Sequence, residues 1–128
     1  MNKVKFQLEY LLKPVSRKIL WNTISTANGL ELWLADEVVN KENVFTFKWG
    51  KEESRDAVIL SMKPLSYIRF HWCDDENDKT YMEMRISKNE MTNERILEIT
   101  DFAEPEELDG MKYLWDSQIE TLKRQGGM

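Results

Sequence analysis

The chain has 128 residues, a net charge of −5 at neutral pH and a sequence pI near 5.0. This acidic balance, with no basic stripe along the sequence, argues against sequence-independent nucleic-acid binding, which needs clustered Lys and Arg to displace counterions from phosphates. The length suits one domain spanning residues 1–128, and five Trp, seven Met and 32% charged residues suit a globular protein with a large apolar core.

Signals for export, membrane insertion and disulfide bonding are missing from the sequence. The first residues enter an alternating pattern at once, without the apolar core of a secretory signal, and no apolar run reaches transmembrane length. The lone cysteine, Cys73, has no partner for an internal disulfide. We therefore expect a cytoplasmic protein with no membrane span.

The N-terminal part predicts one strand and then two short helices. Alternating apolar residues from Val4 to Leu12 indicate a strand with one buried face. A helix is expected from Val15 to Ile24, with Ser16 as its N-cap. Ser25 to Gly29 should break this helix before a further helical turn from Leu30 to Leu34 that carries Trp33. Three apolar residues of the first helix should share its buried side: Ile19, Leu20 and Ile24.

The middle of the chain predicts a run of antiparallel strands. Segments with period-two alternation are separated by Gly, Pro or polar turn residues, which is typical of strands joined by hairpins. The expected strands are Glu37 to Asn40, Val44 to Trp49, Arg55 to Lys63, Tyr67 to Cys73, Thr80 to Ser87 and Thr92 to Phe102.

The last part predicts one long amphipathic helix from Pro105 to Gln125. Pro105 suits the first helical position, and the glycines at 126 and 127 suit its end, leaving Met128 as a frayed terminus. Because a single helix cannot hide its apolar face alone, we expect the strands to form a curved sheet around it, with a cavity between them. The apolar face repeats at helical spacing in Leu108, Met111, Trp115, Ile119 and Leu122.

The residues that could carry chemistry form no convincing catalytic or metal-binding set. His71, the only histidine, and Cys73 lie two positions apart on one strand, so their proximity follows from periodicity, and no third group orients them. The acidic run Asp74 to Asp78 lacks the glycine and terminal glutamate of a calcium loop, which favours a solvated turn. We expect no catalytic residue, no metal and no cofactor.

The order of these elements resembles the helix-grip fold of the START-like, birch-pollen-allergen-like superfamily, and most of all its heat-shock-ATPase-activator-like branch. This resemblance implies an α+β fold with six or seven strands wrapped around the C-terminal helix. It also implies a pocket for an apolar or amphipathic molecule, although members range from lipid carriers to cyclases and co-chaperone domains. The local landmarks are Pro14, Leu20-Trp21, Leu30 to Trp33, Pro64, Tyr67 to Trp72, Leu114-Trp115, Ile119 and Leu122-Lys123.

The leading hypothesis is a domain, monomeric or homodimeric, that binds a lipid-like small molecule without transforming it. A protein-interaction domain acting on a chaperone ATPase is the alternative, and a cyclase- or hydrolase-like enzyme is the third. If its strand face points inward, Arg69 would favour an anionic head group. The same apolar residues could instead form a solid core. The candidate ligand-binding residues are Trp33, Phe47, Trp49, Arg69, Phe70, His71, Trp72, Met82, Met84, Met111 and Trp115.

Overall fold

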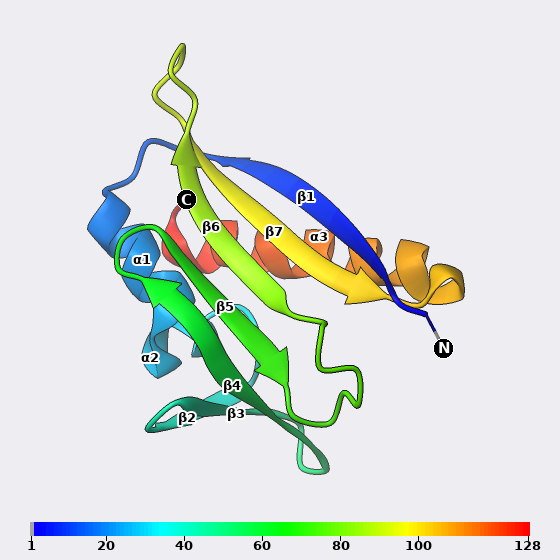
Figure 1. Ribbon diagram of the computed structural model, residues 1–128. Coiled ribbons are helices and arrows are strands. Elements are labelled where there is room, and N and C mark those ends of the chain that lie inside the picture. Colours follow the sequence, from blue (N-terminus) through cyan, green and yellow to red (C-terminus); the bar gives the residue numbers. More distant parts are fainter. Residues whose placement is uncertain (1) are drawn as a thin grey trace.

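A curved antiparallel sheet wraps around one long helix in the computed structural model, which describes residues 2–128 (Figure 1). Two short helices, α1 and α2, close one end of the concave side. The elements are β1 Val4–Leu12, α1 Arg17–Ser25, α2 Ala27–Glu31, β2 Glu37–Lys41, β3 Val44–Trp49, β4 Glu53–Lys63, β5 Tyr67–Trp72, β6 Met82–Lys88, β7 Arg95–Ala103, η1 Pro105–Glu107 and α3 Leu108–Gly126.

The sheet confirms the predicted strands, with boundaries that shift by up to three residues. Its seven strands run in the order β1-β7-β6-β5-β4-β3-β2, so the first strand pairs with the last and the other neighbours are sequential. All pairings are antiparallel. A bulge between Ile59 and Ser61 shifts the β4–β5 register, and bulges of this kind increase the local bend of a sheet.

The helices after β1 differ in part from the prediction. Ser16 caps α1 as predicted, because its hydroxyl accepts a hydrogen bond from the Ile19 amide at 3.0 Å. Two other expectations are wrong: Ile19 is 54% exposed, and Gly29 lies inside α2, which Thr26 caps. Gly29 permits close contact between α1 and α2, since a Cβ there would lie 2.2 Å from the Asn22 carbonyl oxygen.

Helix α3 follows the predicted apolar stripe. Trp115, Ile119 and Leu122 are buried, whereas Leu108 and Met111, nearer the N-terminal end, are only partly covered. Gly127 ends the helix in a left-handed conformation with φ of 68°. Within residues 2–128, no helix combines the length and apolar character that crossing a bilayer requires.

The prediction of a frayed C-terminus is wrong. Met128 is 4% exposed, and its backbone amide donates to the carbonyl of Lys123 at 3.0 Å. Its own carbonyl accepts from the Lys13 amide at 2.8 Å. The last residue thereby ties the end of α3 to the segment that follows β1.

Aromatic rings fill the concave side near β3, β4 and β5. Phe47 packs edge-on against Phe70 and Trp72, with ring centroids 6.2 Å and 5.4 Å away. Phe45 and Phe70 form a further edge contact at 5.3 Å. Such contacts add to the stability gained by burying the rings themselves. This part of the interior is therefore solid core.

Replacing Trp115 by Ala should lower the free energy of unfolding by about 3–5 kcal/mol, because the side chain is almost fully buried between α3 and the sheet. Leu114→Ala is the matched control on the same helix. Leu114 is half-exposed, so its loss should cost about 1 kcal/mol or less. Urea denaturation of both variants measures the difference. Equal losses would mean that Trp115 does not anchor the helix.

Candidate functional site

Recesses open on two sides of α3 where the helix meets the sheet. We call the larger one, of about 640 Å³, the tryptophan groove; it lies between α3, the α2–β2 connection and the β3–β4 turn region. Its lining residues are Glu31, Leu32, Trp33, Leu34, Ala35, Asp36, Trp49, Glu53, Arg55, Leu114, Gln118 and Thr121. We call the smaller one, of about 220 Å³, the Asp101 recess; it is lined by Lys3, Arg55, Trp72, Asp75, Thr80, Tyr81, Asp101, Phe102, Ala103, Glu107 and Met111.

The tryptophan groove has rigid aromatic walls. The Trp33 indole donates to the Thr23 carbonyl at 3.1 Å, and the Trp49 indole donates to the Leu34 carbonyl at 2.9 Å. Both polar indole groups are thus satisfied by backbone, so these side chains can offer the groove only apolar ring surface. Leu32 and Leu114 add half-exposed apolar side chains at the rim. Glu31, Asp36, Glu53 and Arg55 also line the groove, which therefore suits a molecule with both an apolar and a polar part.

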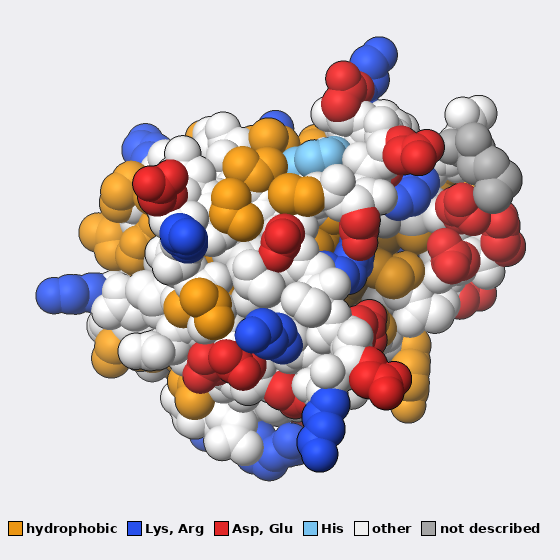
Figure 2. Space-filling view, turned by 90° about the horizontal axis from the view of Figure 1, so that it is seen from below, with side chains coloured by type: hydrophobic (Ala, Val, Ile, Leu, Met, Phe, Trp, Pro, Cys, Tyr) orange, Lys and Arg blue, Asp and Glu red, His pale blue; other side chains and the backbone are white. Residues whose placement is uncertain are grey.

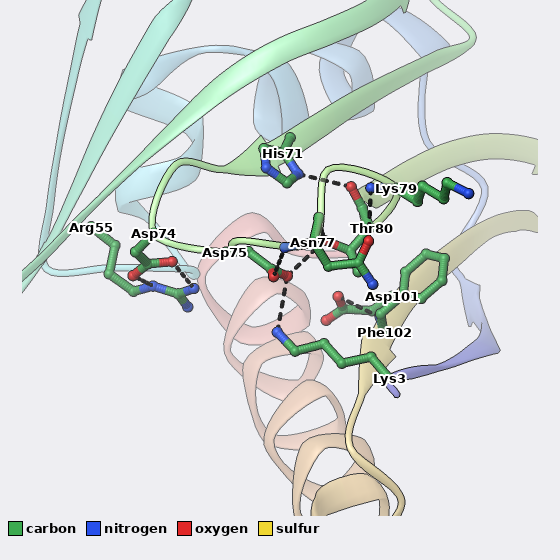
Figure 3. Close-up of polar contacts among 10 residues, drawn as sticks. All are labelled: Lys3, Arg55, His71, Asp74, Asp75, Asn77, Lys79, Thr80, Asp101 and Phe102. Carbon is green, nitrogen blue, oxygen red and sulfur yellow. Dashed lines mark hydrogen bonds and ion pairs between the residues drawn. The ribbon is translucent and has the colours of Figure 1, made fainter. Parts of the chain in front are cut away.

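Arg55 lies at the boundary between the groove and the recess and lines both. Its guanidinium stacks over the Trp72 ring, 4.0 Å from the centroid, and donates two hydrogen bonds of 2.8 Å to Asp74 (Figure 3). These hydrogen bonds lower the pKa of Asp74. Sequence reasoning missed Arg55 as an inner-face residue. The signal was strand alternation. Arg55, Ala57 and Ile59 are two residues apart from one another, so their side chains point to the same side of β4.

Asp101 is a buried carboxylate at the edge of the recess, with 6% of its surface exposed. One oxygen accepts from the Trp115 indole at 2.9 Å, and the other accepts from the Phe102 amide at 2.8 Å. Burial raises the pKa of Asp101, and the hydrogen bond from Trp115 offsets only part of this effect. Sequence reasoning also missed this residue. Asp101 follows Leu97 and Ile99 at alternate positions of β7, so its side chain is expected on the same inner face.

The loop between β5 and β6 closes the recess. Asp75 accepts from Lys3 at 2.9 Å and from the Thr80 hydroxyl at 2.6 Å (Figure 3). Burial alone would raise the pKa of Asp75, but the hydrogen bonds from Thr80 and Lys3 outweigh it and lower the pKa to about 2. The acidic run is thus an ordered turn tied to β1. In the described part of the chain, no three His, Cys, Asp or Glu side chains are grouped in a way that could hold a metal ion.

The structure separates the sequence-predicted ligand-binding residues into five groups. Trp33 and Trp49 line the groove, and Trp72 and Met111 line the recess. Trp115 is buried and reaches the recess through its hydrogen bond to Asp101. The remaining apolar candidates, Phe47, Phe70, Met82 and Met84, are in the solid core.

Arg69 and His71 lie on the outer face of the sheet, because they alternate with the buried Ile68 and Phe70. Arg69 donates to Glu83 at 2.8 Å and stacks over Tyr81. Because its side chain points outward, Arg69 does not meet the condition stated for contact with an anionic head group in the pocket. The Nδ1 atom of His71 hydrogen-bonds the Thr80 carbonyl at 2.9 Å, which requires a proton on that nitrogen. Cys73 lies beyond the end of β5 and is exposed.

The opposite pKa shifts of Asp101 and Asp75 predict opposite pH dependences. Asp101 has a higher pKa in the folded than in the unfolded state, where it is about 3.9. Its contribution to the free energy of unfolding is therefore largest below about pH 3.9 and is lost as pH rises through the folded pKa. The stability advantage of the native protein over Asp101→Asn should therefore shrink as the pH increases above about 4.

Asp75→Asn is the matched control for this experiment. Its lowered pKa means that the carboxylate stabilises the fold above about pH 4 and loses this effect as pH falls toward 2. The native advantage over Asp75→Asn should grow as pH rises between about 2 and 4. Urea denaturation across this range measures both slopes. Slopes of the same sign would contradict the assigned environments.

Comparisons with known proteins agree with this architecture. A solution structure of the Bacteroides fragilis protein BfR322 is 52% identical, with a TM-score of 0.68, over 97% of this chain and 91% of that one. The Aha1 dimer from Colwellia psychrerythraea is 14% identical with a TM-score of 0.78, over 94% of this chain and 93% of that one, so the likeness is one of fold. The same holds for DynU16 of the dynemicin biosynthetic locus, 12% identical with a TM-score of 0.77, where the match covers 94% of this chain and 46% of that one.

No curated protein matches the chain. A family model described as a START-like superfamily domain matches residues 1–127. This match covers every residue that lines the groove and the recess. The predicted resemblance is thereby confirmed, and the chain belongs to the START-like superfamily.

Proposed function

We propose that this protein binds a hydrophobic or amphipathic small molecule in the tryptophan groove, without transforming it. The observation that carries the proposal is an aromatic-walled groove of about 640 Å³ beside α3. Its volume is within the range of about 300–1,000 Å³ that is usual for small-molecule sites. Membership in the START-like superfamily supports a ligand-binding role at the level of the superfamily.

The lining favours a ligand with an apolar body and a polar end. Trp49, Leu32 and Leu114 give the groove an apolar wall, on which an acyl chain or a fused ring would lose contact with water. Gln118 and Thr121 lie on the α3 side and carry groups that hydrogen-bond. A lipid-like molecule would place its chain on the tryptophan side and its polar end toward these residues.

The state of the charged groups supports binding rather than catalysis. Arg55 is held by Asp74, and Asp75 is held by Lys3 and Thr80. Asp101 accepts hydrogen bonds from Trp115 and from the backbone. Each of these side chains already has partners inside the protein, and an acid-base or nucleophilic role would have to break them.

A protein-interaction role is the second candidate. Its support is the fold shared with an Aha1 protein, and that protein is a dimer. Between the two expected states of this chain, the dimer of that relative favours a homodimer. Sedimentation of the purified protein across a range of concentrations distinguishes a homodimer from a monomer.

Displacement of a solvatochromic probe such as anilinonaphthalene sulfonate by medium-chain and long-chain fatty alcohols tests the ligand proposal. We expect saturable displacement by the native protein. Leu114→Arg should weaken it about tenfold or more, because a charged side chain would extend into the apolar groove. Tyr113→Arg is the control: Tyr113 is the neighbouring residue on α3, is 76% exposed and does not line the groove.

Native mass spectrometry of protein purified from its own host complements this assay by detecting a co-purified molecule. The proposal fails if no member of the alcohol series displaces the probe. It also fails if Leu114→Arg and Tyr113→Arg retain the same affinity as the native protein.

A further inference from the structure

The turn between β4 and β5 presents apolar side chains to water. Leu60, Met62 and Leu65 are 52%, 49% and 42% exposed, and Pro64 between them is also exposed. They lie within six residues at one end of a hairpin, so they form a local apolar tip rather than scattered contacts. Single exposed apolar residues are ordinary on a protein surface, but a local group of large ones marks an interaction surface.

Leu65 adopts a backbone conformation that leucine rarely takes, with φ of 67°. Asn is better suited to this left-handed region and would remove the apolar side chain. A leucine at this position is therefore unfavourable for the backbone and is only partly buried, which points to a role at the surface. We call Leu60, Met62, Pro64 and Leu65 the hairpin tip.

Basic residues surround the hairpin tip. Lys63 lies between Met62 and Pro64 and is exposed, and the Arg17 guanidinium donates to the Leu65 carbonyl at 3.1 Å. The neighbouring Lys18 on α1 is exposed as well. The two segments that meet here, residues 13–30 and residues 57–73, contain no Asp or Glu, although the whole chain has a net charge of −5.

Two clusters of negative charge lie at the other end of the molecule. The loop at residues 74–78 and the segment at residues 104–109 are rich in Asp and Glu, and both are far from α1 and the hairpin tip in Figure 1. Figure 2 shows acidic side chains close together at one end of the molecule, while further acidic, basic and hydrophobic side chains are interspersed over the rest of this face. Because charges separated by more than the Debye length of about 10 Å are largely screened, the acidic end does not cancel the local positive field.

We propose that the hairpin tip docks on an anionic lipid bilayer surface. The apolar side chains would enter the boundary between headgroups and acyl chains, while Arg17, Lys18 and Lys63 face the anionic headgroups. Charge complementarity selects this partner, because an apolar group with a basic border matches a surface that is apolar below and negative above. The proposal does not depend on ligand binding in the tryptophan groove.

The number of groups involved predicts weak, reversible binding. Each basic residue at an anionic surface contributes about fivefold in affinity, and each half-exposed leucine that becomes buried contributes a similar factor. Together they give an association constant on the order of 10⁴ M⁻¹, comparable to that of a single myristoyl chain. Such binding orients the protein on a bilayer and does not anchor it permanently.

Vesicle co-sedimentation of the full chain tests the proposal. We expect binding to vesicles that contain phosphatidylserine, much weaker binding to phosphatidylcholine alone, and loss of binding at high salt. Lys63→Gln and Leu65→Asn should each reduce the partition constant about fivefold. Leu65→Asn is compatible with the backbone conformation at this position, so its effect cannot be assigned to unfolding.

Two control variants remove similar groups elsewhere. Tyr113 is 76% exposed on α3, so Tyr113→Asn deletes an exposed apolar ring outside the proposed surface. Lys79→Gln deletes an exposed positive charge on the acidic loop. Neither should change vesicle binding by more than about twofold.

Three results would overturn the proposal. The first is the absence of binding to phosphatidylserine vesicles at low salt. The second is an equal loss of binding in the control variants. The third is concentration-dependent self-association that Leu65→Asn abolishes, since this would identify a second copy of the chain as the occupant of the hairpin tip.

Discussion

The buried hydrogen bond from the Trp115 indole to the Asp101 carboxylate is the contact on which the arrangement of the sheet and α3 depends. Burying a carboxylate is costly unless hydrogen bonds compensate it, and Trp115 supplies one of the two that Asp101 receives. The apolar face of α3 would allow sliding along the concave sheet, because hydrophobic contact is non-directional. A directional bond at 2.9 Å fixes one position of the helix.

This position of α3 on the sheet explains why openings remain beside the helix. The buried anchors, Trp115, Ile119 and Leu122, lie in the middle and C-terminal part of the helix, whereas Leu108 and Met111 are only partly covered. Beside the groove, large aromatic side chains fill the space between α2 and α3, where Trp33 packs against Trp115 with ring centroids 6.3 Å apart. Arg55, stacked on Trp72, separates the groove from the recess. The free volume is thus a consequence of the large side chains that support the helix.

The fold could be predicted from the sequence because its signals are periodic. Alternation in the strands and the stripe from Leu108 to Leu122 identify the elements, and their order leads to the resemblance. Local errors arose where tertiary contact decides the outcome. Gly29 resembles a helix breaker but is needed for the contact between α1 and α2, and Met128 is held by hydrogen bonds to segments distant in the sequence.

The candidate site was harder to predict because its polar members occupy positions that pattern reasoning treats as surface. Asp101 and Arg55 alternate in step with buried residues of their strands, and this alternation can be read from the sequence. Which side chains they contact depends on how the strands and α3 meet. Arg69 shows the converse, since the sequence left its face open and the structure places it outside with Glu83. Trp33 and Trp49 line the tryptophan groove, but a ligand-binding role for them stays a prediction, and the groove exists only because the α2–β2 connection and β3 meet α3.

A double-mutant cycle on Asp101 and Trp115 measures whether their hydrogen bond holds α3 on the sheet. Free energies of unfolding would be measured for the native protein, Asp101→Ala, Trp115→Phe and the double variant. At a pH where Asp101 is ionised, we expect a favourable coupling energy of about 1.5–3 kcal/mol, the range for a hydrogen bond to a charged group. Additivity within about 0.5 kcal/mol would contradict it, because the helix would then be held by apolar contact alone.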